Sequence, residues 1–224
     1  MKRLFKLPDV QNFVDYKKSI YLTVFVIYAA ILVLVLTLPA NPMGMAFIVT
    51  TPMLFVLMYL FRKILLNDIK VFKEHIKRYI PFILVGFVLA VALNILGNII
   101  SQLIGVYGGG TNQEAVISAF WQTPLLGVFA LLIVAPISEE LIFRRTIMVM
   151  VENKFLYYLL SAFLFGMAHV VIGFTFPSSF VFIFPTALAG LGYAFVYDKS
   201  NNIWCPIFVH LLSNALALAF LLAS

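Results

Sequence analysis

Residues 123–151 read TPLLGVFALLIVAPISEELIFRRTIMVMV. Apart from a short charged centre the stretch is apolar, and it is longer than the roughly 20 residues that a helix needs to cross a bilayer. Glu139 and Glu140 lie next to each other inside it. A charged side chain near the bilayer centre costs about 2.5 to 3.5 kcal/mol on insertion scales, so an intramembrane carboxylate predicts a functional site. Arg144 follows Glu140 by one helical turn, where it can pair with that carboxylate.

The composition of the whole chain is that of a membrane protein. Its 224 residues are 63% hydrophobic and 11% charged, and the mean hydropathy is +1.07. These values exclude a soluble domain and predict one all-α domain over residues 1–224, a polytopic integral membrane helix bundle. The bundle should have about seven to eight transmembrane helices, because apolar runs of sufficient length occur near 20–38, 45–61, 80–105, 123–150, 154–173, 180–197 and 203–222.

The basic residues predict the orientation of the bundle, because Lys and Arg accumulate in cytoplasmic connections. Every second connection is basic, and the segments 39–44, 106–122 and 174–179 contain no Lys or Arg. We therefore expect the N-terminus in the cytoplasm, the C-terminus outside, and a basic inner surface facing anionic lipid, with no nucleic-acid partner. The glycines Gly108–Gly110 predict a flexible outer turn. The 15 basic residues are Lys2, Arg3, Lys6, Lys17, Lys18, Arg62, Lys63, Lys70, Lys73, Lys77, Arg78, Arg144, Arg145, Lys154 and Lys199.

Residues 62–79 form an amphipathic connection. Apolar residues recur in it at alternating steps of four and three, with Lys and Arg between them, at Leu65, Ile69, Phe72, Ile76 and Tyr79. This spacing predicts a helix that lies along the cytoplasmic interface of the membrane. Its role is either to anchor the chain at the surface or to gate substrate entry.

Three further polar side chains fall with Glu139 in one layer roughly 10 Å thick when residues are counted from the inner turns at about 1.5 Å each. They are His169 in the fifth predicted span and His210 and Asn214 in the seventh. His210 and Asn214 are four residues apart and therefore share one helix face. Four polar groups from three helices thus converge near the middle of the membrane.

A polar stripe also marks the third predicted span, where Asn94, Asn98 and Gln102 repeat every four residues beside Ser101. Such side chains commonly hydrogen-bond between membrane helices. The alternative is that they line an aqueous cavity that supplies water to the site.

The convergent residues form three short motifs that occur in order on successive hydrophobic segments. They are Glu139-Glu140-x-x-x-Arg144, Phe165-x-x-x-His169 and His210-x-x-x-Asn214. Over about residues 120–220 the chain resembles the CAAX protease and bacteriocin-processing family of intramembrane proteases, also called the ABI family. The resemblance implies a catalytic core in this region and a bundle of about eight membrane helices around a water-filled cavity.

The resemblance also implies roles for four residues. Glu139 together with His169 would activate a water molecule for attack on a peptide carbonyl. His210 and Asn214 would stabilise the oxyanion that develops. General chemistry agrees with this division, because a desolvated carboxylate suits a general base and preset donors suit an oxyanion hole.

Glu140 and Arg144 would be structural by the same resemblance, fixing the helix and the position of Glu139. No metal is expected, since the chain has no HExxH motif and Asn214 is a poor zinc ligand. A hydrolytic zinc site built from two carboxylates and two histidines is the alternative.

The family implies cleavage of a hydrophobic or membrane-associated peptide, in bacteriocin self-immunity or in peptide maturation. Short connections and a small chain resemble a bacterial member, so we expect a multi-pass protein of the bacterial cell membrane. One alternative is a non-catalytic immunity protein that binds or sequesters a bacteriocin or its receptor. Another is a proton-coupled transporter, although the sequence shows no repeated halves. The oligomeric state does not follow from the sequence.

Overall fold

The structure is a computed structural model that describes residues 5–8, 16–37, 42–106, 117–118, 120–170 and 178–223. No strand occurs in this part of the chain, so the predicted all-α fold is confirmed for it. The predicted turn at Gly108–Gly110 lies outside the described residues. In chain order the elements are α1 (Lys18–Thr37), α2 (Pro42–Leu60), α3 (Arg62–Glu74), α4 (Ile76–Leu103), α6 (Pro124–Phe129), the π-helix η1 (Ala130–Val134), α7 (Ala135–Glu140), the π-helix η2 (Leu141–Thr146), α8 (Ile147–Met150), α9 (Lys154–Ala168), α10 (Ser178–Val181), α11 (Ile183–Ser200) and α12 (Trp204–Ala223).

Helices occupy every range in which the sequence predicts a membrane span. Within the described residues, three helical segments are long and apolar enough to cross a membrane by length and composition. They are Ile76–Leu103, Pro124–Met150 and Trp204–Ala223. A membrane protein with apolar helices is therefore established, and the number of seven to eight crossings stays a prediction.

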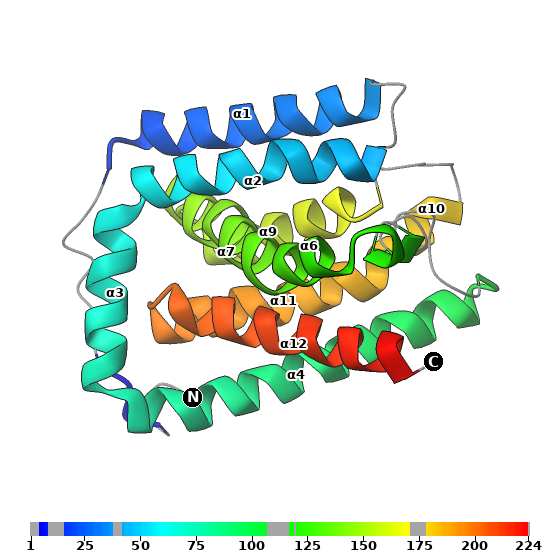
Figure 1. The fold of residues 1–224 in the computed structure, drawn as a ribbon. Helices are drawn as coiled ribbons and strands as arrows, with labels where there is room; N and C mark the ends of the chain where they lie inside the picture. The colour runs from blue at the N-terminus through cyan, green and yellow to red at the C-terminus, as the bar shows by residue number, and fades with distance from the viewer. Residues whose placement is uncertain are drawn as a thin grey trace.

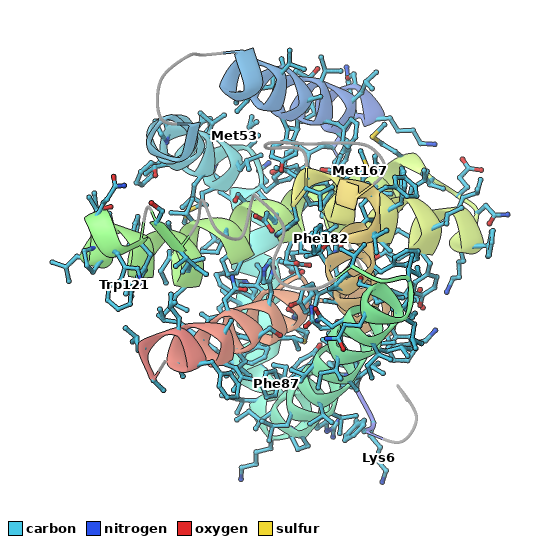
Figure 2. All side chains as sticks on the ribbon, turned by 90° about the vertical axis from the view of Figure 1, so that its right-hand side faces the viewer. Lys6, Met53, Phe87, Trp121, Met167 and Phe182 are labelled. Atoms are coloured by element: carbon cyan, nitrogen blue, oxygen red, sulfur yellow. The ribbon has the colours of Figure 1, made fainter. Side chains whose placement is uncertain are left out.

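The part of the α6–α8 segment that carries the glutamates, α7 with η2, lies in the interior of the bundle, whereas α6 has no buried residue. Figure 1 shows α1 and α2 side by side along one edge of the bundle, with α4, α11 and α12 along the opposite edge. The α6–α8 segment lies between these two groups: α7 contacts both α2 and α12, and η2 contacts α1, α9 and α11. Figure 2, which looks along the bundle, shows the other helices arranged around this interior. Both adjacent glutamates therefore lie inside the protein.

Helix α3 lies across one end of the bundle, transverse to α1, α2 and α12 (Figure 1). The predicted helix over 62–79 is divided at His75, which ends α3 and precedes α4. Leu65 and Phe72 of α3 are buried against the bundle, and its lysines are exposed. The transverse position suits an interfacial helix, whose cytoplasmic location stays a prediction.

Asp68 fastens α3 to the beginning of α12. Its carboxylate is buried and accepts a hydrogen bond of 2.9 Å from the N–H of Ile203. The amide of Asn202 donates to Asp68 O at 2.7 Å, and the indole of Trp204 donates to Leu65 O at 2.9 Å. These bonds fix the starting point of α12, the helix that carries two of the predicted site residues.

Arg145 does not lie where the pattern of basic connections places it. It is buried inside the bundle, as is Arg144. The guanidinium of Arg145 donates hydrogen bonds of 3.2 Å to the hydroxyls of Tyr197 and Tyr21. For Arg144 the sequence offers Glu140 as a buried partner, whereas the tyrosine partners of Arg145 are distant in the sequence.

Close approach of α4 and α11 forms the tightest helix pair. A methyl group on Gly97 would lie 2.5 Å from Pro185 Cα, so only glycine permits this separation. Asn94 Nδ2 donates to Pro185 O at 3.0 Å, and Ser101 Oγ donates to Val181 O at 3.0 Å. These members of the polar stripe hydrogen-bond between helices, which is the first of the two roles considered for it.

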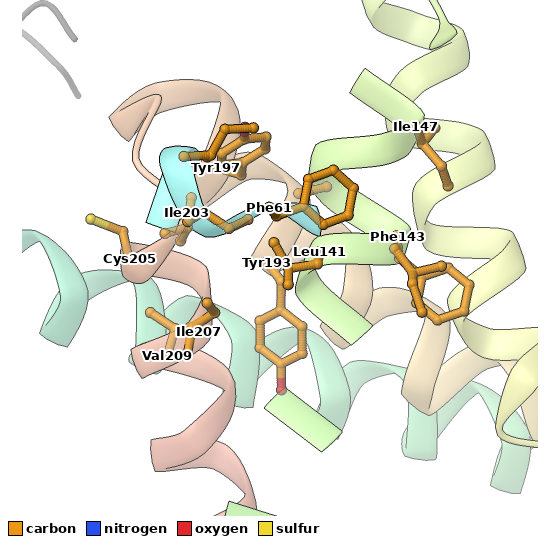
Figure 3. Packing of buried hydrophobic residues seen from close by; sticks show 14 of the residues in the cluster. Phe61, Leu141, Phe143, Ile147, Tyr193, Tyr197, Ile203, Cys205, Ile207 and Val209 are labelled. Atoms are coloured by element: carbon orange, nitrogen blue, oxygen red, sulfur yellow. The ribbon is translucent and has the colours of Figure 1, made fainter. Parts of the chain in front are cut away.

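The buried apolar core surrounds the helix segment that carries the glutamates. Figure 3 shows residues of η2 and α8 packed against residues of α11 and α12. Close packing of this kind resists displacement of the polar groups it encloses. The labelled members that are at most 4% exposed are Phe61, Leu141, Phe143, Ile147, Tyr193, Tyr197, Ile203, Cys205, Ile207 and Val209.

Candidate functional site

The two glutamates lie on α7, a six-residue α-helical stretch between two π-helices. A π-helix has a wider turn than an α-helix and often marks a functional site. Side-chain hydroxyls accompany the irregular backbone: Ser138 Oγ donates to Val134 O at 2.6 Å, and Thr146 Oγ1 donates to Leu141 O at 2.9 Å. The backbone thus departs from regular α-helix on both sides of the carboxylates.

Glu140 is fully buried and contacts two basic groups. Its Oε2 lies 3.0 Å from Arg144 Nε, and both side chains are 0% exposed. The two atoms are close enough for an ion pair but are not aligned as a hydrogen bond. Its Oε1 lies 2.8 Å from His210 Nδ1. The expected pair of Glu140 and Arg144 is present, and His210 joins it.

Arg144 receives further stabilisation inside the bundle. Its Nη2 donates to Gly190 O at 3.2 Å, and its guanidinium carbon lies 4.4 Å from the centre of the Phe165 ring. Both contacts offset the loss of hydration of a buried cation. The cation is therefore held in one place beside Glu140.

Glu139 faces two histidines. Its Oε2 lies 3.8 Å from His169 Nε2 and 3.9 Å from His210 Nε2. These separations are longer than hydrogen bonds, so the contacts are electrostatic. Glu139 and His169 are 19% and 28% exposed, whereas His210 is 3% exposed. In the described part of the chain no donor hydrogen-bonds Glu139 Oε2, a buried atom.

The hydrogen bonds at Nδ1 decide which ring nitrogen is available at each histidine. His169 Nδ1 lies 2.8 Å from Phe165 O, and a carbonyl oxygen only accepts, so Nδ1 carries the proton. His210 Nδ1 faces the Glu140 carboxylate, which likewise accepts when ionised. Both rings therefore direct Nε2 toward Glu139.

Two aromatic rings hold the imidazoles. The ring of Tyr193 stacks on that of His210 with centroids 4.7 Å apart and planes 16° apart. Phe165 contacts His169 at 4.4 Å and His210 at 5.6 Å between centroids. Sequence reasoning assigns no role to Tyr193. No sequence pattern indicates its role, because the stacking partner His210 lies on a different helix.

The side chain of Asn214 hydrogen-bonds the backbone of the segment that leads to the glutamates. Its Nδ2 donates to Leu131 O in η1 at 2.8 Å. It lies one helical turn after His210 on α12, as the i, i+4 spacing predicts. Glu139, Glu140, His169 and His210 are thus brought together by direct contacts, and Asn214 is held at the adjoining turn.

In the described residues, no three His, Cys, Asp or Glu side chains are grouped so as to hold a metal ion. Glu139 Oε2 lies 3.8 Å from His169 Nε2 and 3.9 Å from His210 Nε2, and these three side chains are the ones that the zinc alternative invokes.

Residues 121–216 match the family model described as Type II CAAX prenyl endopeptidase Rce1-like. This stretch contains all of the predicted site residues. It agrees with the region of about 120–220 over which the motifs resemble the CAAX protease family. The family resemblance is therefore confirmed.

Three curated relatives have sequences similar to this chain. YdiL of Bacillus subtilis, named as a candidate membrane peptidase, is 30% identical over 146 residues, 63% of this chain and 56% of YdiL. An uncharacterised protein of Mycoplasma capricolum is 29% identical over 169 residues, 69% of this chain and 48% of that protein. The membrane-embedded CAAX protease MroQ of Staphylococcus aureus is 26% identical over 160 residues, 66% of this chain and 60% of MroQ.

The chain matches about half to three fifths of the length of these relatives. No solved structure matches the chain significantly.

Replacing Glu140 by Ala should strongly destabilise the fold, because it leaves the buried charge of Arg144 without its anion. Breaking one partner of a buried ion pair typically costs about 3 to 5 kcal/mol. The free energy of unfolding in detergent measures the loss. Glu152→Ala is the matched control, since Glu152 pairs with Lys18 on the surface, where ion pairs contribute little. Equal stability of the two variants would show that the buried pair is not important to the fold.

Proposed function

We propose that this protein is an intramembrane endopeptidase that hydrolyses a peptide bond of a membrane-associated peptide or protein, and the match of residues 121–216 to the Rce1-like family model supports this. One observation carries the proposal: Glu139 Oε2 lies within 3.9 Å of the Nε2 atoms of both His169 and His210. The three side chains come from α7, from the end of α9 and from α12. The names of YdiL and MroQ support peptide hydrolysis as the reaction.

Glu139 and His169 would activate the water that attacks the scissile carbonyl. With the proton of His169 on Nδ1, its Nε2 can accept a hydrogen bond from a water that also bonds Glu139 Oε2. As the water oxygen bonds to the carbonyl carbon, its proton passes to this pair. The same proton is then delivered to the leaving nitrogen when the C–N bond breaks.

His210 and Asn214 would stabilise the oxyanion of the tetrahedral intermediate. Because His210 directs Nδ1–H to Glu140, its Nε2 donates a hydrogen bond only when the ring is an imidazolium. Removing one oxyanion donor typically costs about 10² to 10³ in kcat.

Glu140 and Arg144 would act as structural support. Arg144 neutralises Glu140, and Glu140 in turn orients the ring of His210. Through α7 the same pair fixes Glu139, the adjacent residue.

The substrate we propose is a hydrophobic or membrane-associated peptide that reaches a site within the lipid bilayer. The protein would be a multi-pass component of a bacterial cell membrane with its N-terminus in the cytoplasm. The exposed lysines of α3 support this orientation, because they suit the anionic cytoplasmic surface. A role in peptide maturation or bacteriocin self-immunity fits such a substrate.

Purified protein in detergent should cleave members of a library of short membrane-associated peptides. Glu139→Ala and His169→Ala should each lower kcat/KM by at least about 10²-fold, because each removes part of the water-activating pair. Mass spectrometry of the products measures the rate and the cleavage site. Glu152→Ala, a surface variant, is the control for folding and purification.

Cleavage by Glu139→Ala at the control rate would remove this carboxylate from the mechanism. Loss of cleavage in the variants with retained protection of cells against a bacteriocin would instead favour the immunity protein that binds its target.

Metal removal separates the water-activating pair from a zinc site. Treatment with a membrane-permeant chelator should leave the cleavage rate within about twofold, because Glu139 and His169 need no Lewis acid for general-base catalysis. Activity that disappears with the chelator and returns with added zinc would establish the metal-dependent alternative.

A further inference from the structure

The backbone of the glutamate segment leaves one carbonyl group without its regular donor. In η1 the N–H of Ala135 donates to Ala130 O, at the five-residue spacing of a π-helix. In this register Leu131 O would accept from residue 136, but Pro136 has no N–H. The α-helical donor for Leu131 O is the N–H of Ala135, which is already used. Neither helical register therefore supplies Leu131 O.

Asn214 of α12 supplies the missing donor. Its Nδ2 lies 2.8 Å from Leu131 O. A carbonyl oxygen only accepts, so this bond also fixes which end of the carboxamide is nitrogen. The amide group has two N–H bonds, and one of them stays available for a second acceptor. The bond thus holds the Asn214 amide in one orientation beside the segment that carries Glu139.

We propose that Pro136 is a positioning residue that orients Asn214 by keeping Leu131 O free to accept from it. This rests on the proposed function, in which the second N–H of Asn214 donates to the oxyanion. Pro136 precedes Glu139 by three residues. Pro136 therefore acts on the amide that stabilises the intermediate, although it lies on the segment that carries the base.

The rival explanation is that Pro136 acts only by bending its own helix and so placing Glu139. The two explanations differ in one respect. If Pro136 acts through Leu131 O and Asn214, substitutions at 136 and 214 are not independent. If it acts only on Glu139, their effects multiply.

A double-variant cycle on thermal stability tests the bond without any substrate. Asn214→Ala should lower Tm by about 3 °C in the chain with Pro136, because Leu131 O loses its donor. With Pro136→Ala in place, the new N–H can bond Leu131 O, and the loss from Asn214→Ala should shrink to less than about half. An equal loss in both backgrounds overturns the proposal.

The same four proteins are compared in peptide cleavage. Pro136→Ala should lower kcat about tenfold with KM within about twofold, and should cause no further reduction in the Asn214→Ala background. If the double variant loses kcat by the product of the two single-variant factors, the proposal is wrong. Pro124→Ala is the matched control. Pro124 begins α6, where a backbone N–H has no acceptor within the helix, so kcat should not change.

Two further comparisons keep the outcomes separate. If Glu139→Ala cleaves as fast as wild type, the proposed protease function is refuted. The thermal stability cycle would still show whether Asn214 bonds Leu131 O in the way proposed.

If Pro136→Ala does not fold, Asn214→Asp replaces it, since an ionised carboxylate cannot donate to Leu131 O. Asn214→Asp should lose at least as much Tm as Asn214→Ala, and a wild-type Tm overturns the proposal. Thr23→Ala, whose exposed hydroxyl bonds Ser19 O within α1, is the control for that variant.

Discussion

A buried carboxylate between two basic groups is the constraint on which the interior of this protein depends. Glu140 is fully buried, with Arg144 Nε 3.0 Å from one oxygen and His210 Nδ1 2.8 Å from the other. Without these partners a buried carboxylate would be strongly unfavourable. The requirement fixes α12 against α7, and with it the distance from His210 to Glu139. Packing of Tyr193 and Phe165 around the rings then leaves few alternative positions for either histidine.

The irregular backbone of the glutamate segment serves the same arrangement. Two π-helices flank α7, and a proline lies at its second position. In a regular helix all carbonyl groups of this segment would be bonded internally. Here Leu131 O is open to Asn214 from the neighbouring α12, and the hydroxyl of Ser161 on α9 reaches Phe143 O at 2.7 Å. The bond from Asn214 therefore forms at a carbonyl group whose helical donor is missing.

Much of this site follows from the sequence, because charged residues inside apolar spans have few acceptable locations. Counting depth along the helices puts Glu139, His169 and His210 in one layer, and the structure brings them into contact. The contact of His210 with Glu140 could not be predicted in this way, because the depth of a residue along its helix does not determine which neighbouring helix its side chain contacts. The burial of Arg145 was missed for a related reason: its tyrosine partners lie on α1 and α11, far away in the sequence. The π-helices also change the helical register, so a 3.6-residue period fails across residues 130–146.

The site depends on one hydrogen bond: the Nδ1–H of His210 donates to an ionised Glu140, and the ring therefore directs Nε2 toward Glu139. Nitrogen-15 NMR of protein labelled at its three histidines tests this most directly, with the His210 signal assigned from its loss in His210→Gln. His210 Nδ1 should carry a proton at neutral pH, and its hydrogen-bonded signal should disappear in Glu140→Ala. An unprotonated Nδ1 in the wild-type protein would mean that Glu140 is the donor, and the arrangement described here would be wrong.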